Sequence, residues 1–63
     1  MRFDIDVDYS THDALKAGVV TVGTRHFAID APDADAATLV AAQWVAADRI
    51  ASGVIPTRTY VCT

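Results

Sequence analysis

The sequence has one cysteine, one lysine and no long hydrophobic run. A single thiol, Cys62, excludes a disulfide within the chain. Zinc sites use paired, closely spaced ligands, and His12, His26 and Cys62 lack such spacing, so we expect no metal and no cofactor. A chain of 63 residues has room for one thin core. With a disulfide and a metal set aside, we expect self-association to add to the stability of this small core.

Basic residues are also few. Five basic residues stand against eight acidic ones, for a net charge of −3. Proteins that bind nucleic acids neutralise phosphates with lysine and arginine, so we expect no direct nucleic-acid binding. No apolar run approaches the roughly 20 residues that cross a bilayer, and no signal segment follows Met1. We therefore predict a cytoplasmic protein without membrane contact.

Apolar and acidic side chains alternate at the amino end. The bulky residues take the odd positions and the acids the even positions, in the order Phe3, Asp4, Ile5, Asp6, Val7, Asp8 and Tyr9. Successive side chains of a strand point to opposite faces of its sheet. The pattern therefore predicts a strand in a sheet with one dry face and one hydrated, acidic face.

The next segment contains signals for a short helix and a turn. Ser10 with Asp13 resembles a helix cap, and Gly18 stands where a short helix would stop. Gly23-Thr24 is interpreted either as a two-residue hairpin turn or as a bulge in one long strand. Both alternatives place the same four side chains on the dry face: Val20, Val22, Phe27 and Ile29.

A long helix is predicted over 34–51. Asp33 is its expected cap, and Ser52-Gly53 its expected stop. At 100° per residue one apolar sector is predicted to cover the sheet: Ala36, Leu39, Val40, Gln43, Trp44, Ala47, Ile50 and Ala51. The other side carries Asp35, Thr38, Ala42, Val45 and Arg49 and has little charge. With the exposed Tyr60, that side supplies the candidate partner-contact residues Thr38, Ala42, Val45, Arg49 and Tyr60.

A last strand is predicted over 57–62. Pro56 cannot donate to a ladder, which places the start of this strand at a sheet edge or outside the sheet. Pairing of Arg58 with the acids of the first strand favours a register in which Tyr60 and Cys62 point outward. The inward side chains are then Thr57, Thr59 and Val61.

These elements predict one α+β domain spanning residues 1–63. We expect an antiparallel sheet of three or four strands with one long helix on one face, in the order ββαβ or βββαβ. The alternative is a shortened βαββαβ arrangement with a true helix in the first connection. The predicted core is Phe3, Ile5, Val7, Val20, Val22, Phe27, Ile29, Leu39, Val40, Trp44, Ile50 and Val61.

The acidic row Asp4, Asp6 and Asp8 has two possible functions. Its spacing resembles the start of a calcium loop, but on a strand these carboxylates stand about 6.6 Å apart, too far to share one ion. A regular row of acids could instead imitate a phosphate backbone and inhibit a nucleic-acid-binding protein. A solvated face that discourages aggregation is the structural alternative.

No nucleophile–base pair or phosphate loop can be assembled from the sequence, so we predict no enzyme and no catalytic residues. The run at 37–45, followed by Val54-Ile55-Pro56-Thr57, resembles the C-terminal half of small orphan proteins of GC-rich actinobacteria and their phages. The resemblance implies a phage accessory protein that acts on a host protein in the host cytoplasm. The first hypothesis is therefore a small interaction module, with homodimerisation included. The acidic mimic is the second, and an enzyme or metal carrier the last.

Overall fold

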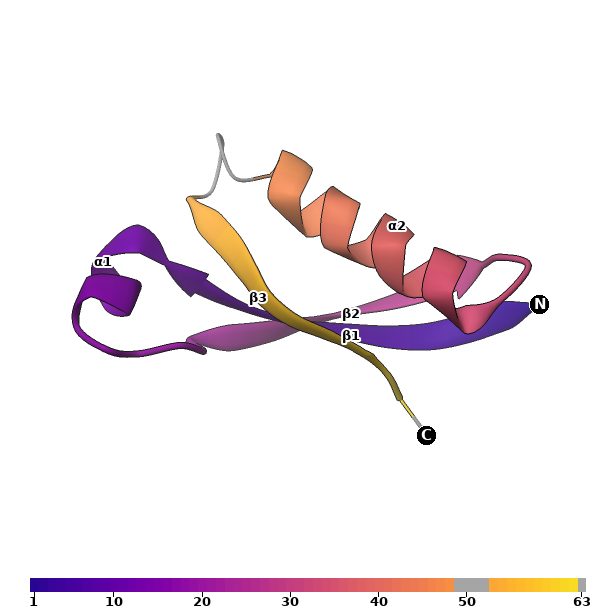
Figure 1. Cartoon of the computed structure of the whole chain (residues 1–63), viewed down its shortest axis with the longest axis horizontal. Coiled ribbons are helices and arrows are strands. Elements are labelled where there is room, and N and C mark those ends of the chain that lie inside the picture. Colours follow the sequence, from indigo (N-terminus) through magenta and orange to yellow (C-terminus); the bar gives the residue numbers. More distant parts are fainter. Residues whose placement is uncertain (49–52, 63) are drawn as a thin grey trace.

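A three-stranded antiparallel sheet carries one long helix on one face (Figure 1). The computed structural model describes residues 1–48 and 53–62. The elements follow in the order β1 (Arg2–Thr11), α1 (His12–Lys16), β2 (Gly23–Asp30), α2 (Ala34–Ala47) and β3 (Val54–Val61). The strand order β2-β1-β3 places β1 in the centre. The predicted α+β class is confirmed, with three strands in the described part of the chain. None of the helices described there has the length and apolar character to span a bilayer.

The alternation at the amino end produces the predicted two-faced strand, which the structure places in the centre of the sheet. Ile5 and Val7 are fully buried, and Phe3 and Tyr9 pack against the same core. Burial of a large aliphatic side chain contributes about 1.5–3 kcal/mol, so this row anchors the sheet to the helix. The intervening acids line the opposite face, which no helix covers in Figure 1.

The first connection contains the short helix α1. Thr11, rather than the predicted Ser10, caps it by accepting a hydrogen bond from the Ala14 amide at 3.2 Å. Ser10 is fully buried and donates from Oγ to the Val19 carbonyl at 2.7 Å. Gly18 ends the helix as predicted, because its φ of 85° suits a residue without Cβ.

The prediction that Val20 and Val22 lie in the core is wrong. They are 66% and 48% exposed, in the loop before β2. Gly23 forms neither a hairpin turn nor a bulge; it is the first residue of β2 and pairs with Tyr9. The Tyr9 ring lies over Gly23 and occupies the space that a side chain there would fill. The Tyr9 ring thus closes the core at this end.

Helix α2 starts where predicted. The Asp33 carboxylate accepts a hydrogen bond from the Ala36 amide at 2.8 Å. Asp35 lies in the first turn, where the helix dipole stabilises a negative charge. The helix ends at Ala47 with Asp48 as its cap. The rest of the predicted range, 49–52, lies outside the described residues, as does the expected core residue Ile50.

The predicted sheet-facing side of α2 is wrong in part: Ala36 and Val40 pack against the core as expected, but only as half-buried residues. The buried residues are Ala37, Ala41 and Val45, spaced four apart, whereas Leu39 and Trp44 are 60% and 52% exposed. Alanine is small enough to let a helix approach a sheet closely. Trp44 instead lies at the flank of the helix and meets Phe27 edge to face, at 5.5 Å between ring centroids. The core is therefore built from smaller side chains than expected.

Strand β3 is an edge strand, as Pro56 predicted. Arg58 pairs with Asp8, and Val61 packs against the core from the helix side of the sheet. The inward direction expected for Thr57 is wrong. Thr57 is the unpaired residue of a β-bulge; it is exposed and donates from Oγ1 to the Asp8 carbonyl at 3.2 Å.

Candidate functional site

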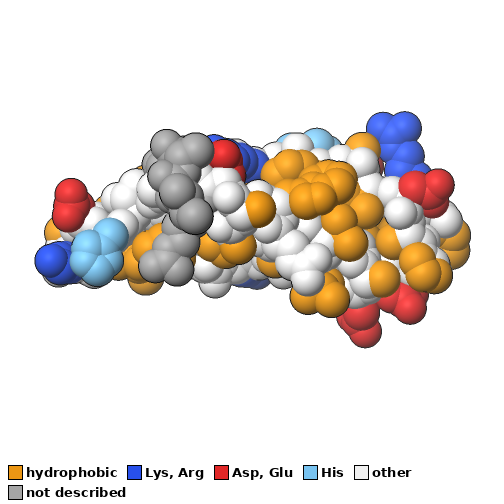
Figure 2. Space-filling view, turned by 90° about the horizontal axis from the view of Figure 1, so that it is seen from above, with side chains coloured by type: hydrophobic (Ala, Val, Ile, Leu, Met, Phe, Trp, Pro, Cys, Tyr) orange, Lys and Arg blue, Asp and Glu red, His pale blue; other side chains and the backbone are white. Residues whose placement is uncertain are grey.

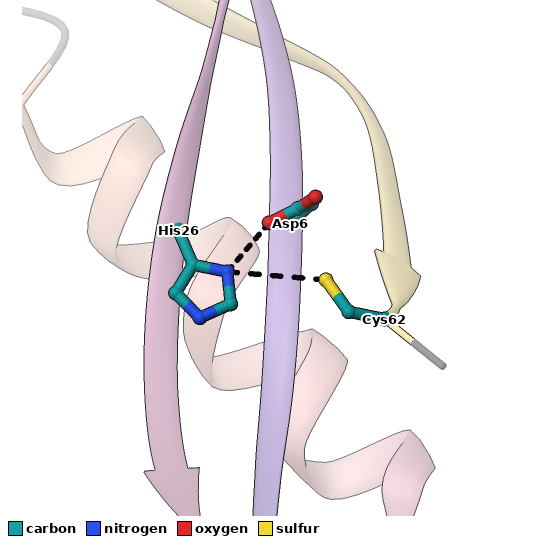
Figure 3. Close-up of side chains that lie close together, drawn as sticks. All are labelled: Asp6, His26 and Cys62. Carbon is teal, nitrogen blue, oxygen red and sulfur yellow. Dashed lines mark hydrogen bonds and ion pairs between the residues drawn. The ribbon is translucent and has the colours of Figure 1, made fainter.

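The helix-free face of the sheet brings together an acid, an imidazole and a thiol. Asp6 lies on β1, and His26 is its cross-strand partner on β2. Cys62 directly follows β3, and its amide donates to the Asp4 carbonyl at 2.8 Å. The three side chains point toward one another across the three strands (Figure 3). One ligand atom from each lies within 4.8 Å of the others.

His26 is the centre of this cluster. Its Nδ1 lies 2.7 Å from Asp6 Oδ1 and 3.9 Å from Cys62 Sγ. Its other nitrogen, Nε2, lies 3.5 Å from Asp4 Oδ1. Both ring nitrogens therefore face acceptors, and two of the three acids of the β1 row are next to one imidazole. We name Asp6, His26 and Cys62 the three-strand cluster.

The hydrogen bond between Asp6 and His26 shifts both proton equilibria. It raises the pKa of the His26 imidazole above its ordinary 6.5 and lowers the pKa of the Asp6 carboxyl below its ordinary 3.8. Desolvation, and then the bond and charge of Asp6, raise the pKa of the Cys62 thiol above 9.0. Without an added cation the cluster therefore favours an imidazolium–carboxylate pair beside a neutral thiol.

The geometry differs from that of a cysteine nucleophile with its base. In such a site the thiol and the orienting acid contact opposite nitrogens of the imidazole. Here Asp6 and Cys62 face the same nitrogen, Nδ1. A raised thiol pKa also disfavours the thiolate that attacks. The residues described enclose no pocket beside the cluster.

Asp8 lies apart from the cluster. Its Oδ1 accepts a hydrogen bond from Thr24 Oγ1 at 2.7 Å and one from the Tyr60 hydroxyl at 3.3 Å. Arg58 pairs with Asp8 across the strands and stacks on the Tyr60 ring at 4.7 Å. The acidic row of Asp4, Asp6 and Asp8 is therefore hydrogen-bonded and interspersed with cationic groups, unlike a bare run of phosphates.

The structure does not bring the five candidate contact residues together. Thr38 and Ala42 are half-buried on α2, and Val45 is fully buried against the sheet. Tyr60 lies on the helix-free face of the sheet. Arg49 lies outside the described residues.

A different surface of α2 is uncharged and partly exposed. Figure 2 shows hydrophobic side chains gathered over the helix on the face seen from above. Leu39 and Trp44 are the large exposed hydrophobic residues of this helix, and both belong to the sector that was predicted to face the sheet. We name this sector the outer stripe, and its described members are Ala36, Leu39, Val40, Gln43, Trp44 and Ala47; Ala36 and Val40 are half-buried against the core and the other four are exposed. No charged residue occurs over 36–47.

The chain matches no protein-family model, no curated protein and no solved structure.

Sequence reasoning missed the three-strand cluster because its members are far apart along the chain. His26 lies 20 residues from Asp6 and 36 residues from Cys62 along the chain. Only the registers of β2 and β3 against β1 make them neighbours. The predicted outward direction of Cys62 was the one available signal, since it places the thiol on the face of the acids.

Proposed function

We propose that this chain is a small non-enzymatic interaction module that pairs with a second copy of itself through the outer stripe of α2. The observation that carries the proposal is the exposure of the two largest apolar side chains of this stripe. Leu39 is 60% and Trp44 52% exposed, while Ala36 and Val40 of the same stripe pack against the core. Tryptophan is among the residues that contribute most to protein interfaces.

The charge distribution supports a second copy as the occupant. Each chain carries a net charge of −3, so two copies repel each other through most of their surfaces. The outer stripe has no charge, and it can face its own copy about a twofold axis without that repulsion. A standard interface covers about 800 Å² on each partner. That is roughly a fifth of the 4067 Å² surface of the chain.

The composition of the core supports the same occupant. Three of its eight buried apolar residues are alanines, and no internal disulfide is possible. Small domains with so little buried area commonly gain stability by self-association. Burial of Leu39 and Trp44 between two chains would add apolar burial that one chain lacks.

The acidic mimic is supported less well. A mimic of the phosphate backbone needs free carboxylates, and Asp6 and Asp8 are hydrogen-bonded to His26, Thr24 and Tyr60. Arg58 adds a positive charge to the same face.

Light scattering tests the proposal. We expect a mass near twice 6.7 kDa for the natural chain, and near 6.7 kDa for Leu39→Glu, which places a charge in the outer stripe. Val20→Glu is the matched control: it makes the same change at an exposed apolar residue of the loop before β2, and should leave the pair intact. Trp44, the one tryptophan, should report pairing by a blue shift of its emission as concentration rises.

A mass of one chain up to millimolar concentration would overturn self-pairing. The outer stripe would then be assigned to a host protein, the partner that the resemblance to phage proteins implies. Dissociation by Val20→Glu but not by Leu39→Glu would place the interface at the loop and would also contradict the proposal.

A further inference from the structure

We propose that Asp6, His26 and Cys62 form a binding site for one Zn²⁺-like transition-metal ion on the helix-free face of the sheet. The site is independent of the outer stripe, which lies on α2. It holds one oxygen, one nitrogen and one sulfur donor, each from a different strand or its end. The sequence alone predicted no metal, because the three donors have no ligand spacing along the chain.

The donor distances are close to those of a tetrahedral zinc site. Bond lengths of about 2.0–2.3 Å place neighbouring ligand atoms roughly 3.3–3.6 Å apart. His26 Nδ1 now lies 2.7 Å from the Asp6 oxygen and 3.9 Å from the Cys62 sulfur. All three ligand atoms lie within 4.8 Å of one another, so shifts on the order of 1 Å would bring them to coordination distance. The His26 side chain is 57% exposed and can make such a shift.

Asp4 supplies a second, separate element of a metal site. Metal-bound histidines commonly donate their other ring N–H to a carboxylate, which fixes the ring and raises its basicity. When Nδ1 binds the metal, Nε2 carries the hydrogen, and Asp4 Oδ1 is already 3.5 Å from Nε2. Asp4 and His26 therefore have the arrangement of a carboxylate–histidine–metal triad, with the carboxylate on one ring nitrogen and the proposed metal on the other.

The donor chemistry selects the class of metal. Ca²⁺ and Mg²⁺ prefer sites with six or more oxygen ligands, which this cluster does not offer. Thiolate and imidazole favour Zn²⁺ and related ions such as Co²⁺. Binding would release the thiol proton of Cys62 and the proton shared by Asp6 and His26 to water. Three protein ligands leave a fourth position open to solvent.

Co²⁺ and Zn²⁺ titrations of the full chain, kept reduced by a phosphine, test the site. We expect one Co²⁺ per chain and a near-ultraviolet thiolate-to-cobalt charge-transfer band. Cys62→Ser should remove the band, and His26→Asn should abolish saturable binding. His12→Asn is the matched control, because this second exposed histidine lies in α1 and should leave binding unchanged. Asp4→Asn should keep the band but weaken binding about 10–100-fold.

Thermal melting gives an independent measurement. Zn²⁺ should raise the Tm of the natural chain, since a ligand that binds the folded state stabilises it, and should leave the Tm of Cys62→Ser unchanged. Circular dichroism would verify that each variant is folded. Absence of the charge-transfer band would overturn the site, as would a band that persists in His26→Asn. One ion for every two chains would also overturn it, because the three donors belong to a single chain.

Discussion

Phe27 and Trp44 meet edge to face, with ring centroids 5.5 Å apart and planes at 65°. The contact joins edge strand β2 to the flank of α2, so Trp44 closes the side of the core while much of its ring stays in water. A residue in this position contributes to stability and remains available to a partner. The two roles predict different effects of one substitution.

Trp44→Ala should lower the free energy of unfolding by about 1–2 kcal/mol, because it removes one aromatic contact and half of a buried ring. A fully buried tryptophan would cost about 3–5 kcal/mol. Urea unfolding at a concentration where the chain is monomeric measures the difference. Ile5→Ala is the reference, since Ile5 is fully buried and its truncation should cost about 2–5 kcal/mol. A greater loss for Trp44→Ala than for Ile5→Ala would contradict the position of α2.

The pair of Asp6 and His26 should make stability depend on pH in metal-free protein. The raised pKa of His26 means that its contribution is complete below about pH 6.5 and is lost as pH rises through the folded-state pKa. The lowered pKa of Asp6 means that its contribution is present above about pH 4 and is lost as pH falls through the folded-state pKa. Stability from this pair is therefore greatest on the acid side of neutrality.

Urea unfolding in the presence of a chelator, between about pH 5 and pH 8, measures this dependence. His26→Asn should flatten the profile in that range. In Asp6→Asn, the NMR titration midpoint of His26 should move down, since its main hydrogen-bond partner loses its charge. An unchanged midpoint would mean that the 2.7 Å contact does not form in solution.

Gly23 and Tyr9 should be energetically coupled. A methyl group on Gly23 would overlap the Tyr9 ring, which also stacks on Arg25 at 5.4 Å. Gly23→Ala should therefore destabilise the natural chain. In a Tyr9→Ala background the same change should stabilise by about 0.4–1 kcal/mol, because alanine restricts the unfolded chain and meets no ring. A double-mutant cycle measures the change of sign, and equal effects in both backgrounds would exclude the contact.

Much of the fold could be predicted because some segments carry strong local patterns. The alternation over 2–9 predicted the first strand and its two faces, since a slip of one residue would bury its acids. Asp33 predicted the start of α2, and Gly18 the end of α1, because capping depends on the residue type at one position. Pro56 likewise predicted an edge strand.

The side of α2 that faces the sheet could not be predicted, because almost every position over 36–47 is apolar. A helix filled with alanine has little hydrophobic periodicity, and the 100° spacing of the larger apolar residues then pointed to Leu39 and Trp44. Close packing on the sheet selected the smaller Ala37 and Ala41 instead. The register of β2 pairs Gly23 with Tyr9, which no local pattern in the sequence indicated, and the three-strand cluster depended on that register.

Ala37 and Ala41 also limit how this protein can recognise anything. Side chains this short seat the helix against the strands, and lengthening either would lift the helix away from Ile5 and Val7. A cavity for a small molecule between the helix and the sheet would require loss of the core contacts that hold these two layers together. We therefore expect recognition at the outer surface of the described residues, where single substitutions can change a partner without changing the fold.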